Sequence, residues 1–366
     1  MIRVLQCVNN MHRAGLETML MNYYRHIDRN KIQFDFLTHR PDRSDYDDEI
    51  EELGGRVYYA PRLFPQNYPA YFRYMKGFFS EHPEYCIIHS HIDAMSYLPL
   101  MTAKKAGVPV RIAHSHNTSI DKDFKYLMKE AFRWQLPYVA TDYLACGTEA
   151  GKFLFGNRDF QIIPNAIDTS GFRFSKEIRD AARRSLGIEN AFVIGCVGRL
   201  TAQKNTSFLI NVFHEICKVD INSVLLVIGG GNEENALKSL AKKLGISENV
   251  MFLGVRSDVN ALYQAMDVFV MPSLFEGLPV VGIEAQFSDL HCVFSSNITR
   301  EVRISEKAHF ISLERSCSDW ASYILKLKNI AGDRNPNFQC ERYDIEQAKD
   351  ILEQYYLEKY ESLNPL

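Results

Sequence analysis

The chain has 366 residues, which is more than one ordinary hydrophobic core needs and suits two domains of similar size. Its 46% hydrophobic and 24% charged residues are typical of a folded globular protein, and the net charge of −3 argues against a nucleic-acid binder with a global basic field. No run of about 18 apolar residues occurs, and the eight cysteines include no CxxC pair. We therefore expect a cytoplasmic protein with reduced thiols, no signal peptide and no membrane span.

Short apolar runs rich in strand formers alternate with stretches of helical period. The first series of candidate strands is 2–8, 33–37, 57–60, 86–89, 110–113, 143–146 and 161–163, and the second is 192–197, 223–228, 250–252, 268–271, 291–294 and 310–311. Continuous apolar strands between helices predict parallel sheets covered on both faces, and two series predict two doubly wound α/β domains. We expect domains at 1–170 and 171–343, and a C-terminal helix within 344–366 that crosses back to the first domain.

The loop after the first strand, Asn9 to Thr18, opens a helix and carries Gly15, where a ligand can approach the backbone. An ordinary strand-to-helix turn is the alternative interpretation. No GxGxxG occurs in this loop, which argues against a dinucleotide oxidoreductase.

Two segments mix cations with aromatic residues at helical spacing, Tyr71 to Phe79 and Phe124 to Trp134. Such helices can lie on an anionic membrane surface, and they can equally be amphipathic helices whose aromatic faces belong to the core. Association with the inner face of the plasma membrane is therefore a hypothesis.

Two HxH pairs follow apolar strands: His89 with His91, and His114 with His116. Residues two apart in an extended segment share a face, so the four imidazoles could bind zinc as in a metal hydrolase. A structural, hydrogen-bonded role for these histidines is the alternative.

The second domain carries two cations at the end of its first strand. Gly198 frees the backbone there, Arg199 offers a planar fork for phosphate oxygens, and Lys204 offers a mobile point charge before a helix that begins near Thr206. Two cations beside a helix N-terminus predict a clamp for a diphosphate, although a pair of solvated surface cations would give the same pattern.

A second loop follows the strand 268–271. It contains two glycines and two glutamates, Glu276 in the loop and Glu284 in the first turn of a helix expected to start near Gly282. Carboxylates at these positions can accept hydrogen bonds from the vicinal hydroxyls of a sugar or a ribose.

The stretch Pro272 to Ala285 resembles the EX7E motif of the retaining glycosyltransferases of family 4, which have the GT-B fold. Four further motifs in the family's order support this resemblance: the phosphate clamp at 198–205, the GxG strand end at 227–231, the nucleobase-side segments at 252–254 and 263–270, and the interdomain segment at 164–168. Within the family, the sequence is most similar to EpsF-like bacterial exopolysaccharide glycosyltransferases.

The resemblance implies two Rossmann-like domains that face each other across a deep cleft. It implies that Arg199 and Lys204 bind the donor diphosphate and are catalytic by electrostatics, and that Glu284 binds the ribose. The donor sugar would be held by Glu276 with the backbone of Gly277, Leu278, Pro279 and Val280, and Gly15 and Gly198 would approach the donor. His116, or alternatively His114, would lie close to the reacting carbon.

The resemblance also implies a hexosyltransferase that needs no metal or other cofactor, because the two cations and helix dipoles do the work of a Mg²⁺ ion. The donor would be a nucleotide diphosphate sugar, with UDP as the first expectation. The acceptor would be a saccharide or a polyprenyl-diphosphate-linked saccharide in surface or exopolysaccharide synthesis, and no nucleic acid is expected. The rival interpretations are a GT-B scaffold without activity and the zinc hydrolase.

The chain departs from the family pattern at three positions. Ala14 replaces the first glycine of the family's GGxE loop, Asp289 replaces the glycine that ends the helix after the second glutamate, and His291 replaces a proline. A left-handed conformation is less favourable for Asp than for Gly. We therefore expect modest destabilisation without loss of the donor site, and a higher melting temperature for Asp289→Gly.

Overall fold

The computed structural model describes residues 1–119 and 126–363, which form two compact units. Unit 1 comprises residues 1–167 together with the C-terminal segment from 342, and unit 2 comprises residues 168–341. The chain passes between the units twice, and the two crossings lie side by side. Ile167 N–H donates to Tyr343 O, and Ile345 N–H donates to Ile167 O, each at 3.0 Å.

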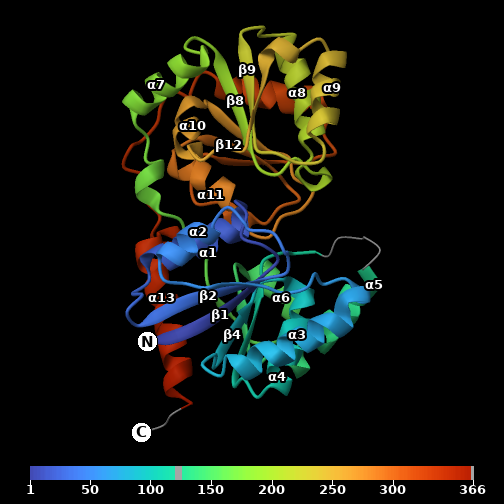
Figure 1. Cartoon of the computed structure of the whole chain (residues 1–366). Helices are drawn as coiled ribbons and strands as arrows, with labels where there is room; N and C mark the ends of the chain where they lie inside the picture. The colour runs from blue at the N-terminus through green and yellow to red at the C-terminus, as the bar shows by residue number, and fades with distance from the viewer. Residues whose placement is uncertain (120–125, 364–366) are drawn as a thin grey trace. The chain divides into compact units, whose positions relative to one another are not determined.

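Unit 1 is built on a parallel sheet whose strands follow the order β3-β2-β1-β4-β5-β6-β7 (Figure 1). The strands are β1 Ile2–Val8, β2 Ile32–Thr38, β3 Val57–Tyr59, β4 Ile87–Ser90, β5 Val110–Ser115, β6 Asp142–Ala145 and β7 Gln161–Ile162. The helices are α1 Gly15–His26, α2 Asp47–Glu52, α3 Tyr68–Glu81, α4 Tyr97–Lys105, α5 Tyr126–Gln135, α6 Thr148–Phe155 and α13 Ile345–Glu361.

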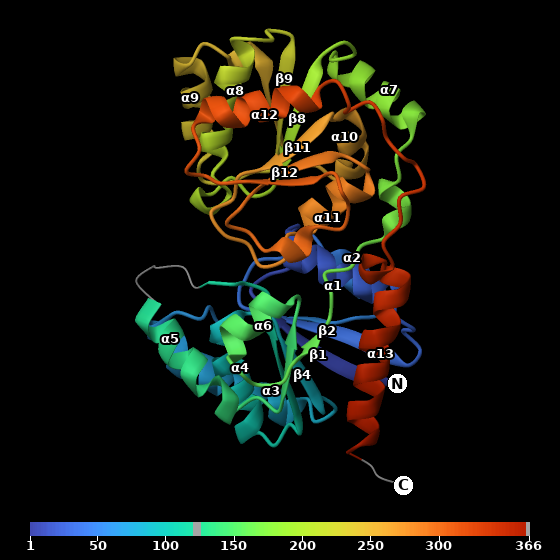
Figure 2. The ribbon, with the colours of Figure 1, turned by 180° about the vertical axis from the view of Figure 1, so that it is seen from behind.

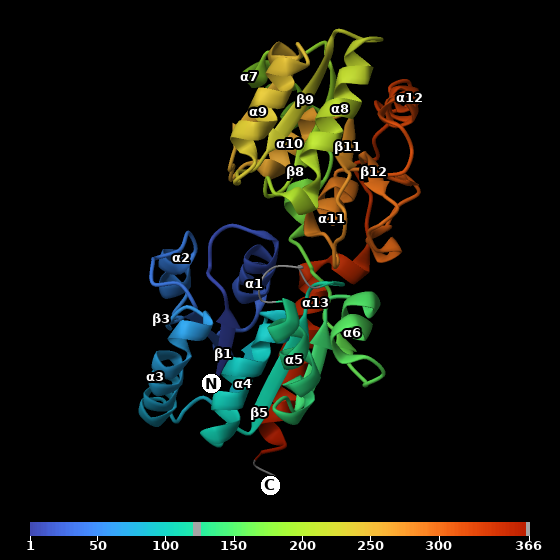
Figure 3. The ribbon, with the colours of Figure 1, turned by 90° about the vertical axis from the view of Figure 1, so that its right-hand side faces the viewer.

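The helices of unit 1 cover both faces of its sheet because the strands alternate apolar residues toward each face. Side chains of α1 and α13 pack on one face, around Phe34 and Ile112. Side chains of α3, α4 and α6 pack on the other, around Leu5 and Ile88. These three helices are labelled in Figure 3. The last helix of the chain thus belongs to the core of the first unit, and it is drawn in red beside the blue strands in Figure 2.

Unit 2 repeats this design with the strand order β10-β9-β8-β11-β12-β13. Its strands are β8 Phe192–Val197, β9 Ser223–Ile228, β10 Val250–Gly254, β11 Val268–Met271, β12 His291–Ser295 and β13 Ala308–Ile311. Its helices are α7 Lys176–Leu186, α8 Thr206–Cys217, α9 Glu234–Lys243, α10 Val259–Ala265, α11 Val280–Phe287 and α12 Cys317–Leu327. Residues of α8, α9 and α12 share one core with the strands.

The prediction of two doubly wound α/β domains is confirmed, and every strand expected from the sequence is present with ends shifted by at most two residues. In both units the first strand lies next to the point where the strand order reverses. In doubly wound sheets, ligands bind beyond the carboxyl ends of the strands near that point. The loops after β1, β4, β8 and β11 are therefore where a site should be sought.

Asp289 follows α11 in the left-handed conformation that its position required, with φ of 53°. Its carboxylate accepts from Lys307 Nζ at 2.6 Å and from the backbone N–H of Asn335. These contacts give Asp289 a role that glycine could not fill, so on the structure we expect Asp289→Gly to lower stability, opposite to the expectation from the sequence. His291 at the start of β12 pairs with His309, Nδ1 to Nε2 at 3.1 Å.

Candidate functional site

The loop after β8 and the loop after β11 are fastened to each other in unit 2. Leu274 N–H donates to Gln203 O at 2.8 Å, and the Gln203 side chain donates back to Phe275 O at 3.0 Å. Asn205 Nδ2 donates to Pro272 O at 3.2 Å. These bonds fix the cation-bearing loop against the glutamate-bearing loop, so their charged side chains meet in one place.

Lys204 and Glu276 are in direct contact. Lys204 Nζ donates to Glu276 Oε1 at 2.6 Å, and the two side chains are 21% and 9% exposed. A carboxylate this deeply buried is stable only when it is paired, and the lysine provides the charge. The ion pair therefore holds an ammonium and a carboxylate next to each other. A ligand could contact the Lys204 ammonium and a Glu276 carboxylate oxygen at the same time.

Arg199 lies at the rim of a pocket that Lys204 and Gly198 also line. The Arg199 residue is exposed, whereas Lys204 is half-buried. Arg199 and Lys204 both line this pocket, and a guanidinium and an ammonium are groups that suit an anion such as a diphosphate.

Ser273, directly after Pro272, lines the same pocket and was missed by the sequence analysis. The residue is fully buried, and its hydroxyl has no hydrogen-bond partner among the residues described. An unpaired buried hydroxyl is uncommon, because leaving its hydrogen bond unmade costs about 1–3 kcal/mol. A small polar residue at the end of β11 is the only signal that the sequence offered.

The glycines after β9 support the cation loop from behind. Gly229 has φ of 125°, and a Cβ added to it would lie 2.0 Å from the carbonyl oxygen of Gly198. A Cβ on Gly231 would lie 2.3 Å from Leu200 O, and Leu200 N–H donates to Gly230 O at 2.9 Å. The GxG segment thus allows two backbones to touch and sets the position of the loop that carries Arg199.

Helix α11 begins at Val280, two residues earlier than the start expected near Gly282, because Pro279 takes the N-cap position with extended backbone. Glu284 therefore lies in the second turn of the helix instead of the first. Residues Gly277 to Val280, expected to meet the donor through their backbone, are all buried.

Glu284 bonds to a tyrosine, not to either cation. Tyr263 of α10 donates from Oη to Glu284 Oε2 at 2.9 Å. Burial raises the pKa of the Glu284 carboxyl to about 7, while the hydrogen bond from Tyr263 acts in the opposite direction. Near neutral pH this carboxyl is divided between its two protonation states, and a hydroxyl ligand would favour the ionised one.

In unit 1, Gly15 begins α1, and a Cβ added there would meet no atom within 4 Å. Its backbone does not need glycine for internal packing, in contrast to Gly229. Ala14, the departure from the family pattern, is the N-cap residue of α1 in an extended conformation that alanine adopts without strain.

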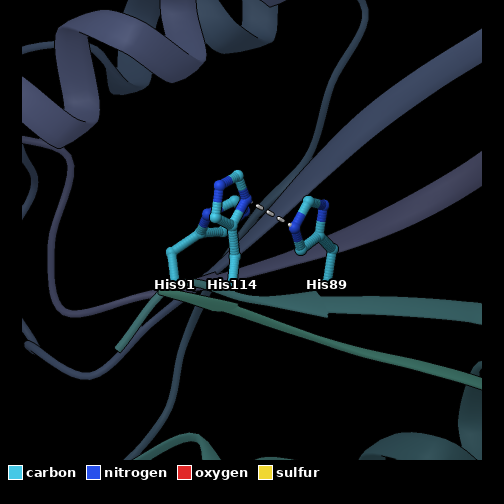
Figure 4. A group of neighbouring side chains, drawn as sticks. All are labelled: His89, His91 and His114. Carbon is cyan, nitrogen blue, oxygen red and sulfur yellow. Dashed lines mark hydrogen bonds between the residues drawn. The ribbon is translucent and has the colours of Figure 1, made fainter. Parts of the chain in front are cut away.

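The four histidines of the two HxH pairs form a single array on one face of the sheet in unit 1. Strands β4 and β5 are neighbours, and their register pairs His89 with Ile112. His89 Nε2 lies 3.0 Å from His114 Nδ1, and His91 Nδ1 lies 3.0 Å from His116 Nε2. Figure 4 shows the rings of His89, His91 and His114 on the same side of the strands. Burial lowers the pKa of each of these three rings well below its usual value, so they are neutral at pH 7.

His116 is the member of the array that is open to solvent. His116 is partly exposed, whereas His114 is 1% exposed, so of these two only His116 can meet a ligand. The backbone N–H of His116 donates to Asp93 Oδ1 at 2.9 Å, and burial lowers the pKa of the imidazole ring to about 3. A neutral imidazole can donate or accept a hydrogen bond, but it does not act as a cationic acid at neutral pH.

The two aromatic segments differ in exposure. On α3, Tyr71, Met75, Phe78 and Phe79 are buried in the core, so that face has no free aromatic surface. On α5 and the turn after it, Leu127, Trp134 and Tyr138 are 81%, 75% and 75% exposed. Phe124 and Lys125, also expected in this helix, lie outside the described residues. None of the helices among residues 1–119 and 126–363 is long and apolar enough to cross a bilayer.

Two family models match the chain. Residues 13–170 match Glycosyltransferase Family 4, and residues 178–339 match Glycosyl transferases group 1. The putative glycosyltransferase EpsF of Bacillus subtilis is 37% identical over 88% of this chain and 87% of its own. An Escherichia coli UDP-Gal:alpha-D-GlcNAc-diphosphoundecaprenol alpha-1,3-galactosyltransferase is 29% identical over 75% of this chain and 76% of its own.

Solved structures share the fold. Anabaena Alr3699/HepE in complex with UDP-glucose superposes with a TM-score of 0.79 at 16% identity, over 98% of this chain and 100% of that one. The sucrose-phosphate synthase of Thermosynechococcus elongatus gives a TM-score of 0.76 at 15% identity, over 99% of this chain and 100% of its own. The prediction of the GT-B fold class is thereby confirmed.

Proposed function

We propose that this chain, which belongs to glycosyltransferase family 4, transfers the sugar of a nucleotide diphosphate donor with retention of configuration. UDP is the proposed nucleotide, because the Escherichia coli relative is named for a UDP-sugar and Anabaena Alr3699/HepE binds UDP-glucose. The observation that carries the proposal is the Lys204–Glu276 contact at 2.6 Å, in a loop assembly whose pocket Arg199 also lines.

In the proposed reaction the bond between the sugar C1 and the diphosphate oxygen breaks, and the acceptor oxygen forms the new bond to C1 on the same face. The leaving diphosphate takes the proton of the acceptor hydroxyl, so no protein nucleophile is required. Negative charge grows on that diphosphate in the transition state. Arg199 and Lys204 stabilise this charge, and we propose that they do so without a metal ion.

The acidic and neutral groups position the donor. Glu276 accepts from a hydroxyl of the sugar, and Lys204 then bridges Glu276 and the phosphates. Glu284 accepts from the ribose hydroxyls, with Tyr263 holding its other side at 2.9 Å. His116, neutral and partly exposed, donates a hydrogen bond near the reacting carbon.

The proposed acceptor is a saccharide, free or linked to a polyprenyl diphosphate, in bacterial surface or exopolysaccharide synthesis. The Escherichia coli relative is named for a diphosphoundecaprenol acceptor, and the Bacillus subtilis relative is an EpsF. A lipid-linked acceptor requires contact with a membrane. The apolar surface for peripheral binding to the membrane is supplied by three exposed residues. Leu127 and Trp134 belong to α5, and Tyr138 belongs to the turn that follows it.

The reaction is tested by incubating the purified protein with UDP-, GDP- and ADP-sugars, with and without a polyprenyl-diphosphate-linked saccharide. We expect nucleotide release that depends on the acceptor and a product with the donor's anomeric configuration. Binding of a nucleotide without release, for every donor and acceptor in the panel, would favour the scaffold alternative. An inverted product would contradict the retaining mechanism.

Membrane binding is tested separately by flotation with vesicles that contain anionic lipid. The variant Leu127→Ser/Trp134→Ser should float less than the wild-type protein. The matched control is Val219→Ser/Ile221→Ser, which removes two apolar residues of similar exposure from unit 2. Equal flotation of both variants and the wild type would contradict a role for α5.

A further inference from the structure

The histidine array of unit 1 has a property that the transfer reaction does not use. Three of its rings, His89, His91 and His114, each offer one nitrogen, and these nitrogens lie within 4.8 Å of one another. Each of the three residues is 2% exposed or less. Ring centroids of His89 and His91, on the same strand face, are 4.1 Å apart, and His91 and His114 are 5.1 Å apart.

Hydrogen bonds within the described residues do not account for the whole array. His89 Nδ1 is 2.5 Å from Tyr356 Oη, and His91 Nε2 is 2.8 Å from Gln6 Oε1. His114 Nε2, in contrast, is buried without a partner in the part of the chain that the structure describes. A buried polar atom left unpaired is unfavourable, so the hydrogen bonds of the described residues do not fully satisfy the array.

We propose that His89, His91 and His114 bind one late transition-metal ion, with Zn²⁺ as the best fit. Neutral imidazole is the ligand that Zn²⁺ takes most often beside thiolate, and a tetrahedral site with bonds of about 2.0–2.1 Å separates its nitrogens by roughly 3.3 Å. The contact between the strands, from His89 Nε2 to His114 Nδ1, is 3.0 Å. A shift of a few tenths of an ångström would make room for the ion.

The groups that form hydrogen bonds with the imidazole rings, Gln6 and Tyr356, also suit a metal site. Ligating histidines usually donate their second N–H to an oxygen, which fixes the ring. Gln6 Oε1 accepts from His91 Nε2, and the Tyr356 hydroxyl oxygen can accept from His89 Nδ1. Gln6 Nε2 in turn donates to Tyr356 Oη at 3.1 Å. Two of the three ligands are thus already oriented by oxygen acceptors.

The ion would act on the stability of unit 1 and not on the donor. Tyr356 belongs to α13, so the array connects β4 and β5 to the last helix of the chain. Lys204, Glu276 and Arg199 belong to the other unit and keep the role proposed for them. The metal site therefore stands whether or not the proposed transfer reaction is correct.

The experiment loads the chelator-treated full-length protein with Zn²⁺ or Co²⁺ and measures bound metal after dialysis. We expect about one ion per chain, a Co²⁺ absorption spectrum of tetrahedral nitrogen coordination, and a melting temperature raised on the order of 5 °C at saturating Zn²⁺. A wild-type chain that retains no metal and shows no thermal shift overturns the proposal, and this measurement needs no variant.

Variants then locate the ion. His91→Gln/His114→Gln should lose the metal and the thermal shift while keeping its far-ultraviolet circular dichroism. The matched control is His291→Gln/His309→Gln, which removes the stacked histidine pair of unit 2, with ring planes 16° apart. Metal retained in the first variant and lost in the second would place the ion elsewhere and contradict the assignment.

Discussion

Two groups of polar side chains lie at the ends of parallel strands, one in each unit, and they differ in charge and access to solvent. In unit 1, the histidines of the array are neutral, and three of the four are 2% exposed or less. In unit 2, Arg199 and Lys204 are cations that line a pocket, one exposed and one half-buried. The same topology thus supports two kinds of site, and only the second suits an anionic donor.

The largest expected effect is on the charged site. Lys204→Ala should lower kcat/KM for the donor by about 10²–10³, because a positive charge that stabilises the leaving diphosphate is lost. The measurement is steady-state nucleotide release. The control is Arg184→Ala, which removes an exposed cation of α7 in the same unit. Activity close to that of the wild type in Lys204→Ala would contradict the role of this lysine.

The second prediction compares two glycines at strand ends. Gly229→Ala should lower the free energy of unfolding by about 3 kcal/mol, because its Cβ would overlap Gly198 O and its φ is 125°. Gly15→Ala, which has open space around the added methyl group, should leave stability unchanged within about 0.5 kcal/mol. Urea denaturation measures both.

Enzyme activity provides a second comparison between the Gly15→Ala and Gly229→Ala variants. If Gly15 is needed so that the donor can approach the backbone, Gly15→Ala should raise the KM for the donor while the protein remains as stable as before. A Gly15→Ala variant with unchanged KM would contradict the proposed approach of the donor to Gly15. A Gly229→Ala variant as stable as the wild type would contradict the close packing of the two loops.

The third prediction concerns pH. The folded-state pKa of Glu284 is raised to about 7 from an ordinary value of 4.5, so the folded state retains a proton that the unfolded state has lost between these values. The contribution of Glu284 to stability should therefore fall as pH rises from about 4.5 to 7, and level off above. Glu284→Gln should remove about 3 kcal/mol of this pH dependence. The control is Glu248→Gln, an exposed glutamate of unit 2.

Thermal unfolding of both variants between about pH 5 and 8 provides the measurement. The two carboxyls differ in burial, so a parallel pH dependence in wild type and Glu284→Gln would show that this carboxyl does not carry the effect. The buried histidines of the array act in the opposite direction below about pH 6.5, because the unfolded state binds protons that the neutral folded rings do not. The effect of Glu284 is therefore the difference in pH dependence between the variant and the wild type.

The smallest expected effect is at Asp289. Glycine would relieve the left-handed backbone, but it would remove the ion pair with Lys307 at 2.6 Å and the bond from Asn335 N–H. We expect Asp289→Gly to lower the free energy of unfolding by about 1 kcal/mol. The control Lys307→Ala should lower it by a similar amount. A rise in the melting temperature of Asp289→Gly would show that relief of backbone strain outweighs the lost contacts.

The regular elements could be predicted from the sequence because each strand is a continuous apolar run between helical stretches. The charged residues of the candidate site could be predicted for a related reason, since Arg199, Lys204 and Glu276 follow such runs directly. HxH spacing also predicted that each histidine pair shares a face.

Contacts between distant segments could not be predicted in the same way. Nothing in the sequence says that β4 and β5 are neighbours with His91 beside His114, or that Tyr356 closes the array from a helix 267 residues beyond His89. The partners of Asp289, Lys307 and Asn335, are 18 and 46 residues away in the sequence. The expected destabilisation by Asp289 was therefore derived from backbone geometry alone. Ser273 lies in the stretch that resembles the EX7E motif but is not one of its glutamates, and only its unpaired buried hydroxyl identifies it as a candidate.

The central claim is that Arg199 and Lys204 together recognise a diphosphate, and isothermal titration tests it most directly. Nucleoside diphosphates and the matching monophosphates of uridine, guanosine and adenosine would be titrated into the wild-type protein and into Arg199→Ala/Lys204→Ala. For the preferred nucleoside, the wild type should bind the diphosphate at least about tenfold more tightly, and the double variant should lose this preference. A double variant that keeps the same ratio would contradict the account.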